Sequence, residues 1–151
     1  EDSYYESHKA NASLSTEIKH NGNSALEMIG TGGDWHTLGA YLYRRPISLN
    51  SYDKICVWVY DTVGNNTLEL RLLDTNGISQ AVWSDWENAC DTPKTQLNSW
   101  VRMCFNLALF NQVNLSALNK VQMTMFWDGV YYFDDITVVP MVYLPLVLRT
   151  H

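Results

Sequence analysis

Hydrophobic and polar positions alternate along short stretches of this chain. Residues 68–72 (LELRL) place three leucines on one face and Glu69 and Arg71 on the other. Residues 57–60 (VWVY), 121–127 (VQMTMFW) and 131–139 (YYFDDITVV) have the same two-residue period, which is typical of β-strands. The longest helix candidate, 107–120, lacks a 3.6-residue apolar stripe, so we expect a loop with at most one helical turn.

Turn sequences separate these stretches. Asn-Gly, Gly-Gly and Asp-Gly pairs recur between them, and Asp128-Gly129 between two apolar stretches predicts a β-hairpin. Eight or nine short strands at this spacing predict an all-β fold. The expected architecture is a β-sandwich or jelly roll of two antiparallel sheets.

Length, charge and composition narrow the function. The chain has 151 residues, which fit one domain, and its net charge of −6 disfavours binding to a nucleic acid backbone. No apolar segment reaches the roughly 20 residues of a membrane span. Aromatic residues make up 13% and charged residues only 17%, below the usual value of about 25%. A surface of this kind suits neutral, hydroxyl-rich ligands.

The three cysteines allow at most one intramolecular disulfide. Cys56 and Cys104 lie in apolar stretches and read as buried thiols, since free cysteine is among the most buried residue types. The alternative is a single bridge, most plausibly one that involves Cys90 from a loop.

Four tryptophans occur in polar or turn-rich surroundings, where an exposed ring could stack on a sugar. They are Trp35, Trp83, Trp86 and Trp127. Aromatic rings bind the apolar face of a sugar, while amide and charged groups bind its hydroxyls. Other aromatic residues in apolar strands are expected in the core: Trp58, Trp100, Phe105, Phe110, Phe126 and Phe133.

Polar partners for such a ligand are expected on the sheet faces. Glu69 and Arg71 share one face of their strand, and Gln122 and Thr124 could extend that face. Tyr41 and Tyr43 share another and are further candidates. The competing interpretation is an ordinary solvated sheet face.

Several segments, in order, resemble the β-jelly-roll carbohydrate-binding modules of secreted glycoside hydrolases, the galactose-binding-like sandwich group. They are the acidic start at Glu1-Asp2, residues 20–28 (HNGNSALEM), 47–61 (ISLNSYDKICVWVYD), 100–102 (WVR) and 132–136 (YFDDI). The resemblance covers nearly the whole chain. It implies a carbohydrate-binding β-sandwich over residues 1–139, with residues 140–151 as an added strand or tail.

The same resemblance implies one structural calcium ion. Its ligands would be Glu1 or Asp2, the turn that contains Asn21 and Asn23, and Asp135. Calcium prefers six to eight oxygen ligands, which these groups can supply. Because neighbouring strand residues point to opposite faces, only one of Asp134 and Asp135 is expected to face this site. The four histidines have no zinc-like spacing.

Three function classes compete for this sequence. The favoured one is a secreted, non-catalytic module, attached to a glycoside hydrolase, that binds plant cell-wall polysaccharide. Its expected ligands are β-glucan chains: cellulose-like, mixed-linkage or xyloglucan. A structural or adhesive sandwich without glycan binding is the alternative. An enzyme is disfavoured, because the chain has no dense carboxylate pattern, nucleophile elbow or phosphate loop.

Overall fold

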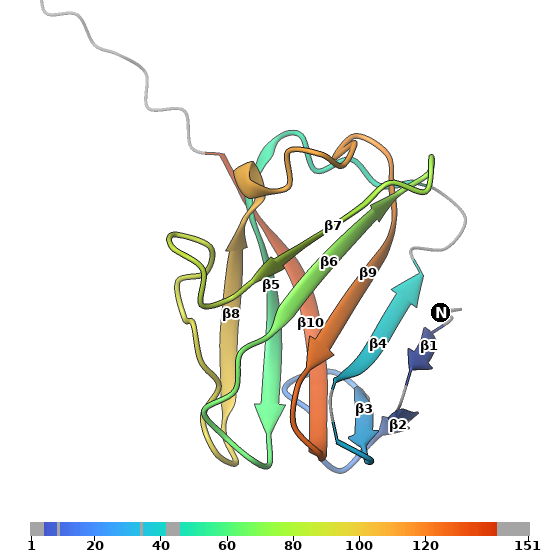
Figure 1. Cartoon of the computed structure of the whole chain (residues 1–151), viewed down its shortest axis with the longest axis vertical. Helices are drawn as coiled ribbons and strands as arrows, with labels where there is room; N and C mark the ends of the chain where they lie inside the picture. Colours follow the sequence, from blue (N-terminus) through green and yellow to red (C-terminus); the bar gives the residue numbers. More distant parts are fainter. Residues whose placement is uncertain (1–4, 9, 34, 42–45, 142–151) are drawn as a thin grey trace, which may run out of the picture.

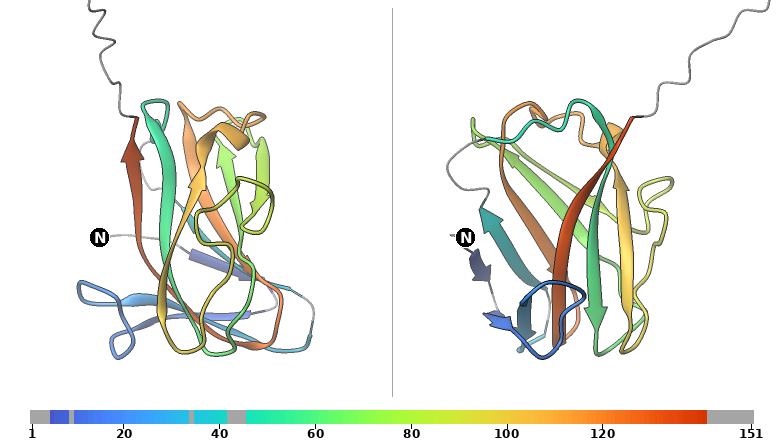
Figure 2. Two further views of the ribbon diagram at one scale, coloured as in Figure 1. Left: turned by 90° about the vertical axis from the view of Figure 1, so that its left-hand side faces the viewer. Right: turned by 180° about the vertical axis from the view of Figure 1, so that it is seen from behind.

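The computed structural model describes residues 5–8, 10–33, 35–41 and 46–141. They form two five-stranded antiparallel sheets that pack face to face, as predicted (Figures 1 and 2). No helix in these ranges is long and apolar enough to cross a membrane.

Sheet A has the strand order β1-β4-β9-β6-β7. Its strands are β1 (Tyr5–His8), β4 (His36–Tyr41), β9 (Leu118–Met125), β6 (Glu69–Asp74) and β7 (Ser79–Trp83). Sheet B has the order β2-β3-β10-β5-β8. Its strands are β2 (Ala10–Ser15), β3 (Ala25–Gly30), β10 (Gly129–Pro140), β5 (Tyr52–Asp61) and β8 (Trp100–Asn106). One 3₁₀ turn, η1 (Leu107–Leu109), is the helical turn expected in the segment after β8.

The core lies between the two sheets. The leucines of 68–72 face inward, as the alternation predicted, and they are joined by buried residues of β9 such as Val121 and Met123. Phe105, Phe110 and Phe133 are also buried, which confirms their predicted place. The alternate residues of β6 and β9 consequently lie on the outer face of sheet A.

Trp58 and Trp100 were expected in the core, and this prediction is wrong. Both lie half-buried on the outer face of sheet B, because inward positions on their strands belong to Val57, Val59 and Val101. The His20 ring, from the loop between β2 and β3, stacks on Trp58 with ring centroids 3.8 Å apart. The tryptophans therefore anchor a loop to the outside of the sheet.

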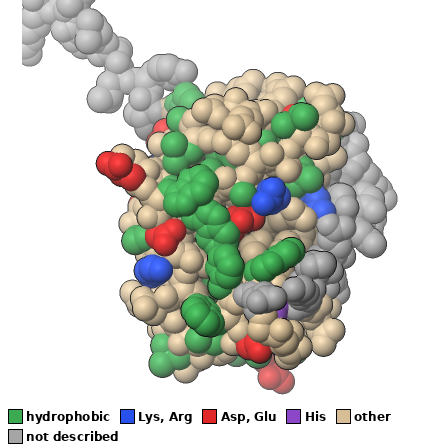
Figure 3. Space-filling view, in the orientation of Figure 1, with side chains coloured by type: hydrophobic (Ala, Val, Ile, Leu, Met, Phe, Trp, Pro, Cys, Tyr) green, Lys and Arg blue, Asp and Glu red, His purple; other side chains and the backbone are tan. Residues whose placement is uncertain are grey.

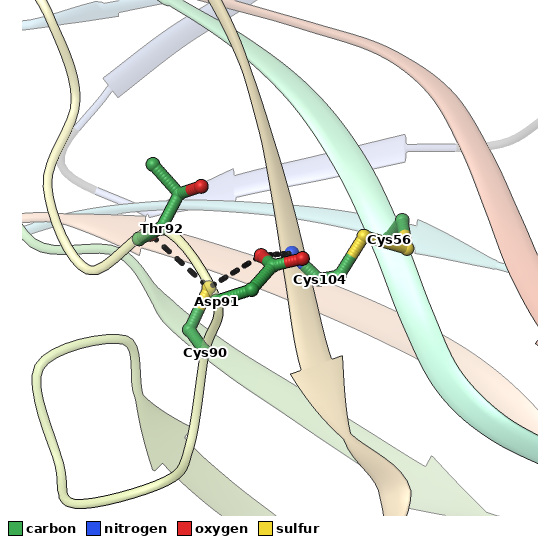
Figure 4. Close-up of a disulfide and its surroundings, with 5 residues drawn as sticks. All are labelled: Cys56, Cys90, Asp91, Thr92 and Cys104. Atoms are coloured by element: carbon green, nitrogen blue, oxygen red, sulfur yellow. Dashed lines mark hydrogen bonds between the residues drawn. A yellow bond between two sulfur atoms is a disulfide. The ribbon is translucent and has the colours of Figure 1, made fainter.

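The disulfide joins Cys56 of β5 to Cys104 of β8, and Cys90 is free (Figure 4). Cys56 and Cys104 are buried and a single bridge forms, which confirms two of the predictions, but the prediction of free thiols at these positions and that of a bridge to Cys90 are wrong. The antiparallel register places Cys56 directly opposite Cys104 on neighbouring strands, a relation that the spacing along the chain does not reveal. Burial raises the pKa of the Cys90 thiol to about 11, so this thiol is a weak nucleophile at neutral pH.

The predicted hairpin at Asp128-Gly129 is also wrong. The chain crosses here from β9 in sheet A to β10 in sheet B. Neither residue adopts the positive φ that a type I′ hairpin needs. Gly129 is required for a different reason: a Cβ atom there would lie 2.5 Å from the Val63 side chain.

Candidate functional site

A hollow of about 550 Å³ opens on the outer face of sheet A, and we call it the groove. Its lining combines aromatic and polar side chains: Trp35, Thr37, Glu69, Arg71, Ser79, Trp83, Gln122, Thr124 and Phe126. Figure 3 views this sheet from outside and shows a band of hydrophobic side chains with acidic and basic groups beside it.

Strand register brings these residues together from four strands. One row across the sheet is formed by register partners: Thr37, Thr124, Glu69 and Trp83. The adjacent row on the same face is Gly39, Gln122, Arg71 and Ala81. The small residues of the second row sit at its two ends, so the polar side chains of Gln122 and Arg71 occupy its middle.

Hydrogen bonds fix the polar floor. Arg71 Nη2 lies 3.2 Å from Glu69 Oε1, and Arg71 Nη1 lies 3.4 Å from Ser79 Oγ. The hydroxyls of Thr37 and Thr124 are 2.9 Å apart. These groups are held in place before any ligand arrives, which lowers the entropic cost of binding.

Aromatic rings border this floor. Trp83 and Phe126 stack with centroids 4.8 Å apart and an interplanar angle of 30°. Trp35 is 41% exposed and Phe126 is 40% exposed. Rings beside a polar floor match the two kinds of surface that a sugar presents.

The segment that carries Trp35 is anchored by Asp128, which follows β9. The Asp128 carboxylate accepts hydrogen bonds from the N–H groups of Gly33 (2.9 Å) and Gly32 (3.1 Å). The buried His36 ring lies 3.0 Å from the same carboxylate through Nε2. These contacts, that of Gly33 above all, lower the pKa of Asp128. The Asp128 carboxylate therefore ties the segment before β4 to the residues that follow β9.

Five of the nine predicted carbohydrate-binding residues line the groove: Trp35, Trp83, Glu69, Arg71 and Gln122. Trp127 is exposed, as expected, and lines a neighbouring hollow. Trp86 is 54% exposed but lines neither hollow. The side chain of Tyr41 and all of Tyr43 lie outside the described residues.

Thr124, which was expected to extend the polar face together with Gln122, also lines the groove, whereas sequence analysis missed three lining residues: Thr37, Ser79 and Phe126. The core prediction for Phe126 is wrong, although its alternation with Gln122 and Thr124 already placed all three on one face. An apolar side chain on a polar face was the available indication of a binding surface.

The expected calcium ligands are partly described. Asp134 Oδ2 accepts the N–H groups of His20 (2.9 Å) and Asn21 (3.1 Å), and Asp135 Oδ2 lies 2.9 Å from His20 Nδ1. The expectation that only one aspartate faces the turn is wrong, because Asp135 (φ 45°) lies in an irregular stretch of β10.

The turn and the aspartate pair are thus neighbours, but their described donors do not by themselves fit calcium. Their contacts are N–H groups and an imidazole ring rather than a shell of oxygens. No group of three acidic, histidine or cysteine side chains suited to a metal occurs within the described ranges. Glu1 and Asp2 lie outside those ranges.

The number and spacing of carboxylates in the groove can be compared with those of a glycosidase active site. Glu69 is the one carboxylate among the described lining residues, whereas glycosidases use two, roughly 5–9.5 Å apart. Asp85 and Glu87, the close acidic pair after β7, are exposed and line neither hollow. Asp85 instead lies 3.9 Å from Lys94.

Comparison with known proteins reveals the fold. No family model and no curated protein matches the chain. Among solved structures, a xylan-binding domain from CBM22 is 13% identical with a TM-score of 0.56, covering 92% of this chain and 89% of that one. A family 30 carbohydrate-binding module is 13% identical with a TM-score of 0.63, covering 95% and 83%. The chain shares the fold of these carbohydrate-binding modules.

A third structure places this fold in an enzyme. It is the Clostridium thermocellum xylanase 10B with its CBM22-1 and GH10 modules, in complex with xylohexaose. It is 14% identical with a TM-score of 0.60, and the match covers 90% of this chain but 26% of that one. The likeness to carbohydrate-binding modules is thus confirmed for the fold.

Proposed function

We propose that this protein is a non-catalytic carbohydrate-binding module that holds a polysaccharide chain in the groove of sheet A. The observation that carries the proposal is the lining itself. Stacked aromatic rings border a hydrogen-bonded polar floor on a shared sheet face. Trp83, Phe126 and Trp35 would pack on the C–H faces of sugar rings, and the floor would bind their hydroxyls.

The charges of the groove favour a neutral polymer. Its described lining contains one cation and one anion, Arg71 and Glu69, and these are paired at 3.2 Å. An acidic polysaccharide would need an uncompensated cation, and Arg71 is already compensated. Neutral plant cell-wall polysaccharides fit this balance.

Xylan is the ligand that we propose first. The CBM22 domain is described as xylan-binding, and the xylanase complex contains xylohexaose. The β-glucan prediction has no such support from these comparisons, so we rank it second.

The setting of the module is part of the proposal. We place it in a secreted protein, attached to a glycoside hydrolase. The Cys56–Cys104 disulfide supports an oxidising compartment, where such bonds persist. Calcium remains a proposed structural ion, held by Asp135 and the neighbouring turn together with Glu1 or Asp2.

Native gel electrophoresis through soluble polysaccharides tests the function. We expect xylan to retard the protein without release of reducing sugar. Trp83→Ala should reduce the affinity about tenfold or more, as for a central aromatic contact, and leave the melting temperature nearly unchanged. Trp86→Ala is the matched control, since this exposed ring lines neither hollow.

Other results would redirect the assignment. Retardation by β-glucan alone would restore the earlier ligand prediction. Release of reducing sugar would show an enzyme. Absence of retardation by every polymer would contradict the proposal and favour a structural or adhesive sandwich.

A further inference from the structure

A second hollow of about 760 Å³ adjoins the groove at one end of the sandwich. Connections between strands line it, together with the segment after β9: Gly33, Val63, Thr67, Lys94, Phe126, Trp127 and Asp128. Phe126 lines both hollows, so the groove and the second hollow meet at this ring.

Trp127 dominates the second hollow. It is 65% exposed, above every other large hydrophobic side chain in the described ranges. Its carbonyl accepts a hydrogen bond from the hydroxyl of Tyr131, whose side chain is fully buried. The backbone under the ring is therefore fixed, whereas the ring itself is open to solvent.

Polar groups accompany this ring, as they do in the groove. The side chains of Lys94 and Asp128 are about half exposed, at 45% and 52%. Lys94 Nζ lies 3.9 Å from Asp85 Oδ2. This distance is too long for a hydrogen bond, so the ammonium can still donate to a ligand. The Asp128 carboxylate is held by Gly32 and Gly33 and keeps acceptor capacity toward solvent.

We propose that the second hollow is an extension of the polysaccharide site, so that one chain crosses Phe126 and continues over Trp127. This inference rests on the proposed function and goes beyond it by giving the site its length. Trp127 would stack on an additional sugar residue, with Lys94 and Asp128 binding its hydroxyls. The path runs along β9 and into the segment that follows it, since Gln122 and Thr124 of β9 line the groove, Phe126 lines both hollows and Trp127 lines the second.

An extended site makes affinity depend on ligand length. A short oligosaccharide fills the groove alone, whereas a longer one also reaches Trp127. Loss of the Trp127 ring should therefore weaken long ligands selectively, which a merely structural role would not do.

Calorimetric titration with xylotriose and xylohexaose tests this. We expect the wild-type protein to bind the hexasaccharide at least about tenfold more tightly than the trisaccharide. Trp127→Ala should lower the hexasaccharide affinity to about that of the trisaccharide and leave the trisaccharide affinity unchanged. Trp86→Ala should bind both ligands as the wild type does. Cello-oligosaccharides of the same lengths replace these ligands if the polymer panel selects β-glucan.

Each contrary result has a distinct meaning. Equal affinities of Trp127→Ala and wild type for the hexasaccharide would overturn the extension while the proposed function stands. Equal weakening of both lengths would place Trp127 within the primary site and also overturn it. Wild-type protein that binds neither the polymers nor the oligosaccharides would overturn both proposals.

Discussion

Glu69 and Arg71 show how two charges can serve recognition of an uncharged ligand. They occupy alternate positions on β6 and face the groove together. Their pairing fixes the orientation of both side chains and cancels their charge. Removal of either partner should therefore change which polymers the groove accepts, more than whether the protein folds.

We expect Glu69→Gln to shift the protein toward acidic polysaccharides. The substitution keeps the shape of the side chain but leaves Arg71 uncompensated. Binding to neutral polymer should weaken, because Arg71 loses the partner that orients it. The loss should be only a few-fold, about 1 kcal/mol or less, since the ion pair is partly exposed. Binding to polygalacturonate should appear at low salt and vanish at high salt. Affinity electrophoresis at two ionic strengths measures both effects.

Glu87→Gln supplies the control for this substitution. Glu87 is exposed and lines neither hollow, yet its loss changes the net charge by the same amount. If Glu87→Gln gains polygalacturonate binding as strongly as Glu69→Gln does, the effect comes from overall charge and not from the groove.

At the scale of elements, the segment between β3 and β4 depends on a carboxylate from another part of the chain. Asp128 accepts the N–H groups of Gly33 and Gly32 and contacts His36. Because these contacts lower the pKa of Asp128, they favour its charged form. The stability they contribute is present above the ordinary aspartate pKa of about 4, and it is lost as the pH falls through the lowered folded-state value.

Asp128→Asn should flatten this acid dependence. The melting temperature of the wild-type protein should fall more steeply between about pH 5 and pH 3 than that of the variant, which has no carboxylate to protonate at this site. Thermal denaturation across this pH range measures the difference. Parallel curves for the two proteins would show that Asp128 contributes nothing to the acid dependence.

Local sequence patterns predicted the strands better than they predicted which strands pair with one another. Alternation identified the inward leucines of β6 and the shared face of Gln122 and Thr124, because each strand has two faces whatever lies beside it. The Asp128-Gly129 pair looked like a hairpin because a sharp reversal and a crossing between sheets use similar residues. Which sheet β10 joins is decided by its pairing with β3 and β5, far away in sequence.

The candidate site shows the same division. Sequence analysis found Trp83 and Trp35 from their polar surroundings but also selected Trp86, which has similar surroundings and lies elsewhere. Register across four strands decides which rings meet, and no local pattern encodes that register. The disulfide illustrates the point again, since Cys56 and Cys104 are opposed only once β5 and β8 are paired.

At the scale of the whole molecule, the Cys56–Cys104 bridge joins two strands of sheet B and closes a long loop that includes β6 and β7 of sheet A. The cysteines are separated by 48 positions. In the chain-entropy account, a loop of this length stabilises the folded state by about 4 kcal/mol. We expect Cys56→Ala/Cys104→Ala to lower the free energy of unfolding by about this amount in urea denaturation. Cys90→Ser, which removes the free thiol but keeps the bridge, is the control. If the double variant had the same free energy of unfolding as Cys90→Ser, the expectation would be contradicted.

Calcium would also stabilise the whole molecule, by linking the loop between β2 and β3 to strand β10. If it binds, chelation should lower the melting temperature more than it weakens polysaccharide binding, because the Asp135 turn lies apart from the groove-lining residues. Thermal shift with and without chelator measures this. Asp135→Asn should lose the shift, and a wild-type protein without any shift would contradict the proposed ion.

The groove is built from two parts that differ in how readily their sequence can vary: the strands of its floor, and the segment before β4 that contacts Asp128. The floor of the groove consists of strand residues whose inward neighbours build the core. The Trp35 border belongs to a connection between strands whose Gly32 and Gly33 N–H groups donate to Asp128. Substitutions in the connection between β3 and β4 can therefore change the width of the groove, while the sheet and its contribution to stability stay the same. Related chains with different ligands would then differ first in this connection and in Asp128, and only later in β6 and β9.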